Sequence, residues 1–300
     1  MTADRIGKLV VVGVGLIGGS FALALKRCGA TARVVGVGRS RENLDAAQHR
    51  GIIDRGLTLD EAWGDELADA DLVLLATPVG QMPSLFATIA PRVGAHAVIT
   101  DAGSTKRDVI AAARASLGPA MARFVPGHPI AGTEHSGAGA AFEALFRDKQ
   151  VVLTPLAETE PAALARVSAC WTQCGAVVRH LDALRHDAIF AAVSHMPHAL
   201  VFALMAELAA RPDADECLAL AGSGLRDFTR LASGDAEMWR DVCIANRDAL
   251  RIELDAYRRA LGRVDALLAA ADGDALLRLF ERARSARADW LESTRGGDEV

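Results

Sequence analysis

The chain has 300 residues, a net charge of −5 and a hydrophobic content of 51%, which together suit a globular protein with room for two domains. The acidic balance argues against a nucleic-acid or anionic-membrane surface. No apolar run reaches the roughly 18 residues of a membrane span, and we expect neither a signal peptide nor a membrane partner. Five cysteines without a CxxC pair fit a reducing compartment, so a cytoplasmic location is expected.

Short apolar runs alternate with helical patterns through the first half of the chain. The predicted strands cover residues 8–12, 32–37, 71–76, 97–101, 124–125, 150–153 and 176–180. Helical spacing follows the early strands at residues 16–28 and 41–50, and each pattern stops at a glycine. This alternation predicts an α/β fold with a doubly wound sheet.

The hydrophobic pattern of the sequence changes near residue 181. Strand patterns end there, and a helical periodicity rich in Ala, Leu and Arg continues to Trp290. We therefore predict two domains, a dinucleotide-binding domain over residues 1–182 and an all-helical domain over residues 183–300.

A glycine-rich turn follows the first predicted strand and opens the first predicted helix. Its residues match the pattern GxGxxG: Gly13, Val14, Gly15, Leu16, Ile17 and Gly18. The first glycine allows the tight turn, the second lets the backbone approach a pyrophosphate, and the third permits close helix–strand packing. The helix N-terminus adds amide donors. In this context the pattern predicts a Rossmann-like site for NAD or NADP.

The second predicted strand ends in Gly38-Arg39-Ser40, without the acidic residue that binds ribose hydroxyls in many NAD sites. Arg39 and Ser40 would favour a 2′-phosphate, so we expect NADP to be accepted. The alternative is that Arg39 is a solvated loop residue. Thr77 and Pro78 end the third strand at the same edge of the sheet and are expected beneath the cofactor.

The stretch Gly127–Gly137, reading GHPIAGTEHSG, is the most chemically suggestive part of the chain. It is too polar and too rich in turn residues for the interior of an element, so we predict a loop that carries chemistry. A plain surface turn is the alternative. Ser104, which follows the fourth predicted strand, is either a helix cap or part of a site.

Several motifs, in this order along the chain, resemble the prephenate and arogenate dehydrogenases of tyrosine biosynthesis. They are GVGLIGGS (13–20), DAGSTK (101–106), GHPIAGTEHSG (127–137), SHMPHAL (194–200) and GLRDFTRLASGDAEMWRD (224–241). The resemblance covers nearly the whole chain. It implies the oxidative decarboxylation of a cyclohexadienol, in which hydride leaves the hydroxyl-bearing ring carbon and the ring carboxylate leaves as CO₂.

The resemblance also assigns roles to individual residues. His128 matches the catalytic histidine, which accepts a hydrogen bond or proton from the ring hydroxyl, and Ser104 matches the serine that orients it. Arg230 matches the arginine that binds a substrate carboxylate, a task suited to a guanidinium. Arg226 and Arg240 remain alternatives for that carboxylate.

His195 and His198 match histidines that face the substrate, and Glu134 matches an acidic residue near the mouth of the site. The two histidines are three residues apart and so are also an alternative metal pair. Because carboxylate or thiolate ligands are not evident nearby, we predict no metal.

For the whole molecule, the resemblance implies a small-molecule substrate and an intertwined homodimer formed by the helical domain. Tyrosine is a candidate competitive inhibitor. The sequence leaves prephenate and arogenate both open. Alternatives are a β-hydroxyacid-type dehydrogenase and a non-catalytic nicotinamide-binding regulator; the former typically needs a lysine in its helical domain, and no lysine follows Lys149.

Overall fold

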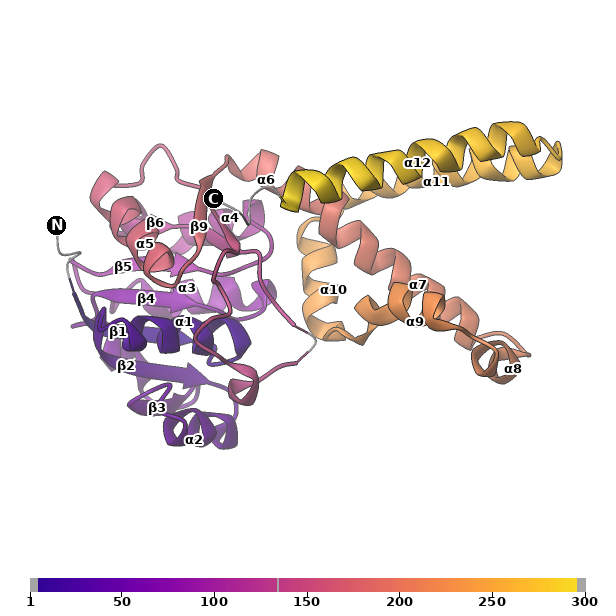
Figure 1. The fold of residues 1–300 in the computed structure, drawn as a ribbon. Coiled ribbons are helices and arrows are strands. Elements are labelled where there is room, and N and C mark those ends of the chain that lie inside the picture. Colours follow the sequence, from indigo (N-terminus) through magenta and orange to yellow (C-terminus); the bar gives the residue numbers. More distant parts are fainter. Residues whose placement is uncertain (1–4, 134, 296–300) are drawn as a thin grey trace. The chain divides into compact units, whose positions relative to one another are not determined.

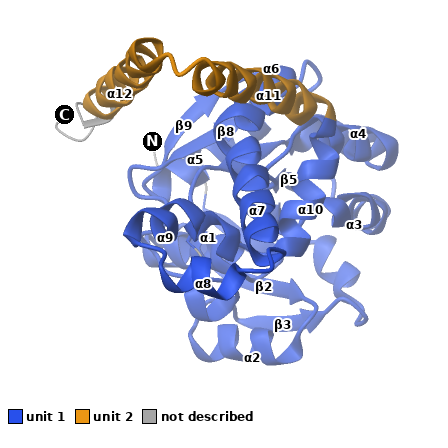
Figure 2. Ribbon diagram, turned by 90° about the vertical axis from the view of Figure 1, so that its right-hand side faces the viewer, with its two compact units in different colours: residues 1–247 blue, residues 248–300 orange. Residues whose placement is uncertain are grey.

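A computed structural model describes residues 5–133 and 135–295 of the chain. It divides into two compact units, residues 1–247 and 248–300 (Figure 2). The second unit is built from two long helices, α11 (Arg247–Ala269) and α12 (Gly273–Arg295). The first contains the α/β part and the helices that follow it. The two units meet between residues 247 and 248, whereas the predicted domain boundary lies at residue 182. That boundary stays a prediction.

A six-stranded parallel sheet in the order β3-β2-β1-β4-β5-β6 forms the centre of the first unit (Figure 1). Its strands are β1 (Ile6–Val12), β2 (Thr31–Gly38), β3 (Arg55–Thr58), β4 (Leu72–Leu75), β5 (Val98–Asp101) and β6 (Phe124–Val125). Val12 pairs with Val37 of β2 and with Leu75 of β4. The strand order therefore reverses beside β1, and ligands of such sheets collect at the carboxyl ends around this reversal. The doubly wound fold is confirmed.

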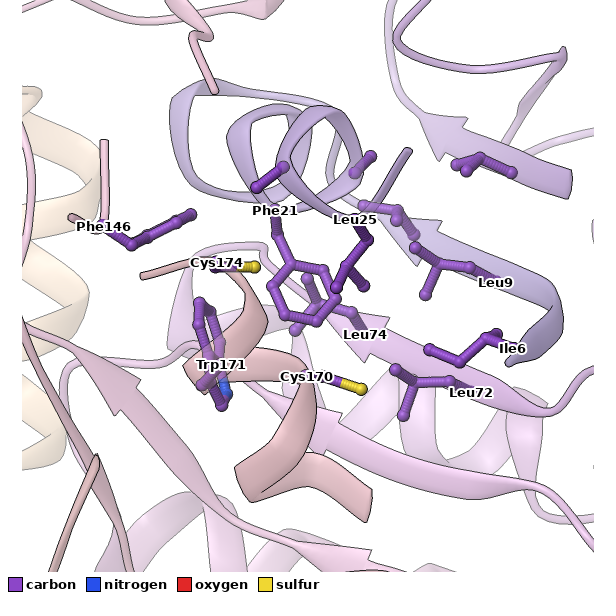
Figure 3. Packing of buried hydrophobic residues seen from close by; sticks show 14 of the residues in the cluster. Ile6, Leu9, Phe21, Leu25, Leu72, Leu74, Phe146, Cys170, Trp171 and Cys174 are labelled. Carbon is purple, nitrogen blue, oxygen red and sulfur yellow. The ribbon is translucent and has the colours of Figure 1, made fainter. Parts of the chain in front are cut away.

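Helices cover both faces of this sheet and create two apolar cores. They are α1 (Leu16–Arg27), α2 (Arg41–His49), α3 (Met82–Ile89), α4 (Arg107–Ser116) and α5 (Pro161–Gln173), with short turns η1 (Trp63–Leu67), η2 (Val79–Gln81), η3 (Gly118–Arg123) and η4 (Ala138–Ala140). On one face the Trp171 ring lies 4.5 Å from that of Phe21 and 5.0 Å from that of Phe146 (Figure 3). Such burial is the main source of stability for the scaffold.

Three expectations about strands are corrected by the structure. The predicted strands near 150 and 177 leave the main sheet and form a second sheet, with order β7-β8-β9. Its strands are β7 (Gly127–Pro129), β8 (Gln150–Leu153) and β9 (Val177–His180). Gly127–Pro129 is thus not loop but a buried strand, paired antiparallel to β8, with His128 in its middle. The short edge strand β3 was not predicted, since its four residues, RGLT, alternate too little.

The helical region begins directly after β9. It comprises α6 (Ala183–Phe190), the π-helical turn η5 (Ala191–His195), α7 (Met196–Ala209), α8 (Ala214–Ala219), α9 (Ser223–Thr229), η6 (Arg230–Ser233) and α10 (Ala236–Ala245). The continuous stretch Ala183–Ala209 is long and apolar enough to cross a membrane by length and composition, with 22% of its most apolar window buried. No such stretch was expected from the sequence. The core helix of a protein without a membrane passes the same test, so this finding is weak evidence for a span.

Candidate active site

The glycine-rich turn between β1 and α1 has the shape of a dinucleotide cradle. Gly13 has φ +98°, and a Cβ there would lie 2.3 Å from the carbonyl oxygen of Ala76. A Cβ at Gly18 would lie 2.2 Å from the Gly13 carbonyl oxygen, whereas nothing lies within 4 Å of one at Gly15. The first turn of α1 has no acidic residue, and Gly15 makes no side-chain cap. The open space at Gly15 and the uncapped amides of Leu16 and Ile17 therefore fit a pyrophosphate.

The residues predicted to bind the adenosine end already have protein partners. Ser40 caps α2, because its hydroxyl accepts a hydrogen bond from the Asn43 amide (3.2 Å). Arg39 lies 3.8 Å from the carboxylate of Glu237 on α10, and both side chains are more than half exposed. Arg39 is thus available to a ligand only in competition with Glu237.

The turn after β4 lies against α10. Pro78 opens η2, and a Cβ at Gly80 would lie 2.6 Å from a carboxylate oxygen of Asp241. The hydroxyl of Thr77 is buried without a hydrogen-bond partner among the described residues. α10 therefore approaches the carboxyl edge of the sheet beside the predicted cofactor site.

A buried ion pair holds the start of β7. Asp101, at the end of β5, and Lys106 are both fully buried and hydrogen-bonded to each other. The Lys106 ammonium donates to the Gly127 carbonyl oxygen (2.5 Å), and the Gly127 amide donates to Asp101 (3.1 Å). Both polar groups of the residue before His128 are thus fixed by one ion pair. A Cβ at Gly127 would lie 2.9 Å from the Asp101 carbonyl oxygen, so the close approach requires glycine.

His128 is buried, with 8% of its surface exposed. Its Nδ1 lies 2.9 Å from Nε2 of His186, and Nδ1 of His186 lies 2.8 Å from the Asp187 carboxylate. Burial is the main cause that holds the pKa of His128 well below its usual value, and the neighbouring His186 and the Lys106 ammonium act in the same direction. The imidazole is therefore neutral near pH 7, as a proton acceptor must be.

His195 and His198 occupy different environments. His195 is fully buried, its Nδ1 lies 3.0 Å from the Asn246 amide nitrogen, and Nε2 has no partner among the described residues. His198 is half-buried, and its Nδ1 donates to the Ser194 carbonyl oxygen (2.9 Å), which leaves Nε2 as an acceptor. Its ring stacks on Trp239, with centroids 3.5 Å apart. His198 is thus better placed than His195 to meet a substrate.

The three arginines that are candidates for binding the substrate carboxylate differ in their partners. Arg240 is paired with Asp241 (2.7 Å) and Glu237 (3.3 Å). Arg230 is exposed in η6 and lies close enough to His198 for its charge to lower the pKa of that histidine, after the larger effect of burial. Within the described part of the chain Arg230 forms no ion pair, and the same holds for the exposed Arg226, but only Arg230 acts on a predicted site residue. This favours Arg230 as the carboxylate ligand.

Two predicted residues remain, of which Ser104 reaches the site, within the described chain, only through its backbone, which acts on the pKa of His195. Glu134 lies outside the described residues. Ser104 is half-buried in the loop after β5, and in residues 5–133 and 135–295 no hydrogen bond from its hydroxyl to His128 is found. Its orienting role stays a prediction. The same described residues contain no cluster of His, Cys, Asp or Glu able to hold a metal.

Sequence reasoning missed several residues that contact the histidines of the site or hold the strand of His128. The most important are His186, Asp187, Trp239, Asn246 and the Asp101–Lys106 pair. The adjacent His186 and Asp187 near the start of a predicted helix were a visible signal, although such pairs are common on ordinary helices. Nothing in the spacing of Asp101 and Lys106 indicated that both would contact Gly127.

Models of one protein family match both halves of the chain. The nucleotide-binding domain of prephenate dehydrogenase matches residues 21–180, and its dimerization domain matches residues 182–282. A cyclohexadienyl dehydrogenase of Zymomonas mobilis is 32% identical over 281 residues, covering 93% of this chain and 94% of the relative.

Two solved structures are also similar. Prephenate dehydrogenase from Aquifex aeolicus with hydroxyphenyl propionate and NAD+ has a TM-score of 0.88 at 32% identity, covering 94% of this chain and 98% of the other. Synechocystis arogenate dehydrogenase has a TM-score of 0.77 at 29% identity, covering 94% and 99%.

The burial of His195 predicts a loss of stability in mild acid. Burial lowers the pKa of His195 from 6.5 to about 4, so between these values the unfolded chain binds a proton that the folded chain does not. The free energy of unfolding should therefore fall as pH drops from 6.5 towards 4, with His195 contributing about 3 kcal/mol of the loss. Urea unfolding of wild type and His195→Gln at pH 7 and pH 4.5 measures the difference. His96→Gln, at a half-exposed histidine, is the control. An equally steep fall in His195→Gln and wild type would contradict the assignment.

Proposed function

Because the chain belongs to the prephenate dehydrogenase family, we propose that it oxidatively decarboxylates prephenate, arogenate or both, as a step of tyrosine biosynthesis. The observation that carries this proposal is the buried, neutral His128 at the carboxyl edge of the sheet, held between the nucleotide-binding part and α6. Named relatives act on both types of substrate, and one solved neighbour holds NAD+.

The described residues supply the groups that this reaction needs. His128 accepts the proton of the ring hydroxyl, since its imidazole is neutral. When bound, NAD accepts the hydride that leaves the hydroxyl-bearing ring carbon. The ring carboxylate departs as CO₂, and its bonding electrons complete the aromatic ring. Arg230, which is exposed and without an ion pair in the described residues, binds the side-chain carboxylate. The stacked His198 and Trp239 form a wall beside it.

We further propose a cytoplasmic homodimer that accepts NADP as well as NAD and binds tyrosine competitively. The helices of the second unit support the dimer, because each leaves large apolar side chains exposed: Ile252, Leu261 and Leu268 on α11, and Leu277, Phe280 and Trp290 on α12. The match of residues 182–282 to a dimerization domain supports it too. Tyrosine retains the ring and the amino-acid side chain of arogenate, so it would compete for the same groups.

Replacing His128 should remove the base and leave the binding groups in place. We expect His128→Asn to lower kcat by roughly 10²- to 10⁴-fold with little change in KM. The assay follows reduced nicotinamide with prephenate and arogenate, each with NAD and NADP. His135→Asn, in the exposed part of the same motif, should keep wild-type activity. The proposal fails if wild type turns over neither substrate with either cofactor, or if His128→Asn is fully active.

Cofactor preference should respond to Glu237, because its carboxylate competes with a 2′-phosphate for Arg39. Glu237→Gln should raise the ratio of kcat/KM for NADP to that for NAD by roughly two- to fivefold, the range of an exposed ion pair. Arg39→Gln should lower the same ratio. Asp235→Asn, which removes a nearby negative charge at the cap of α10, controls for general charge effects. If neither the Glu237 nor the Arg39 variant moves the ratio, this loop does not bind the 2′-phosphate.

A further inference from the structure

Behind His128 lies a second histidine and behind that a carboxylate, both supplied by α6. We propose that Asp187 and His186 are positioning residues that fix the tautomer of His128, with the proton on Nδ1 and the lone pair on Nε2. The inference rests on the proposed function in taking His128 as the proton acceptor. It adds that only one of the two imidazole nitrogens can serve as the base.

In the described part of the chain, the groups hydrogen-bonded to the Asp187 carboxylate are two backbone amides and one imidazole nitrogen. The backbone amides of Lys106 and Arg107 donate to it at 2.8 and 3.0 Å. Burial raises the pKa of Asp187, but the hydrogen bonds from His186 and these amides outweigh that effect and leave the pKa below its usual value. An ionised carboxylate accepts hydrogen bonds and cannot donate them. The Nδ1 of His186, 2.8 Å away, must therefore be the donor.

The donor role of His186 towards Asp187 also fixes which nitrogen of His128 carries its proton. A neutral imidazole carries one proton, so a His186 that donates from Nδ1 can only accept at Nε2. Its partner there is Nδ1 of His128, 2.9 Å away, which must be protonated. The remaining nitrogen of His128, Nε2, is left with its lone pair. The opposite arrangement would require Asp187 to be protonated, against the direction of its pKa shift.

Both rings are neutral in this arrangement. Burial lowers the pKa of His186 and, more strongly, that of His128. At His186 the charges of the Lys106–Asp101 ion pair act in opposite directions, whereas at His128 the Lys106 charge adds to the effect of burial and also favours the neutral ring.

Packing holds the rings in this geometry. The Phe190 ring lies 4.8 Å from that of His128 and 4.5 Å from that of His186. The Asn246 side chain donates to the carbonyl oxygen of Asp187 (2.8 Å), which anchors the carboxylate's own backbone. Packing and hydrogen bonds therefore keep the imidazole of His128 in a single orientation, as a preorganised base requires.

The direct test reads the tautomers of the full-length wild-type protein without substrate. Histidine labelled with ¹⁵N and long-range ¹H–¹⁵N spectra at pH 7.5 distinguish the two ring protonation patterns. We expect His128 and His186 both to carry the proton on Nδ1, assigned by the signals lost in His128→Asn and His186→Gln. A proton on Nε2 of His128 would overturn the inference. If the wild type turned over neither substrate, the proposed function would fail, and these spectra would still decide the tautomer.

Kinetics of three variants separate tautomer control from a merely structural role. Oδ1 of Asp187 accepts from both His186 and the Lys106 amide, and Oδ2 accepts from the Arg107 amide, so an asparagine with its oxygen at Oδ1 would keep His186 as a donor. Asp187→Leu instead removes the acceptor, so Nδ1 of His186 no longer has to carry the proton and the tautomer of His128 is no longer fixed. We expect kcat to fall at least 100-fold with KM within threefold, since a serine-protease triad responds in this way when its histidine loses the correct tautomer. His186→Leu removes the acceptor and should lose a similar factor. His186→Gln restores an accepting oxygen and should lose only about tenfold.

His180→Gln, at the exposed end of β9, is the matched control and should keep wild-type kcat. Thermal unfolding establishes that each variant is folded. Folded Asp187→Leu and His186→Leu proteins that keep kcat within threefold of wild type would contradict the inference, as would a His186→Gln protein no better than His186→Leu. If a variant does not fold, the wild-type spectra alone decide between the two tautomers.

Discussion

Two buried charges, on Asp101 and Lys106, hold both polar groups of the Gly127 peptide and thereby set the position of His128. Removing two charges from water is costly, and a pair of apolar side chains would often be at least as stable. The ion pair instead provides specific hydrogen-bond partners: Asp101 accepts from the amide of Gly127, and Lys106 donates to its carbonyl oxygen. β7 is only three residues long, so its own ladder to β8 would hold it weakly without this pair.

The same short loop connects the nucleotide-binding part to the helices. The amides of Lys106 and Arg107, at the start of α4, are satisfied by Asp187 of α6, which also directs His186 towards His128. A carboxylate at a helix N-terminus is favoured by the helix dipole, so this contact stabilises both α4 and the approach of α6. The segment 101–107 thus has two roles. Lys106 positions His128 through its side chain, and the backbone amides of Lys106 and Arg107 join the nucleotide-binding part to α6.

Much of this molecule could be predicted from its sequence, for identifiable reasons. The parallel sheet was predictable because buried strands read as apolar runs, and GVGLIG between a strand and a helix has few other uses. The strand at Gly127–Pro129 was missed because three residues carry no periodicity. The partners of His128 were missed because they depend on contacts between distant segments: His186 lies 58 residues from His128 in sequence. The stacking of Trp239 on His198 was hidden for the same reason, since a tryptophan in a helix usually indicates packing. The ion pair between Arg39 and Glu237 was also hidden, because Glu237 lies on α10, far in sequence from the loop of Arg39, whose role towards a 2′-phosphate stays a prediction.

A double-mutant cycle between Asp101 and Lys106 tests most directly whether this buried pair holds the strand of the base. The cycle compares the unfolding free energies of wild type, Asp101→Asn, Lys106→Met and the double variant, together with hydrogen exchange at the Gly127 amide. We expect Lys106→Met to cost about 3–5 kcal/mol, because it leaves a buried carboxylate unpaired, and the two changes to be coupled by at least about 2 kcal/mol. Exchange at Gly127 should accelerate in each single variant. A coupling below about 0.5 kcal/mol, with protection at Gly127 unchanged, would contradict the account.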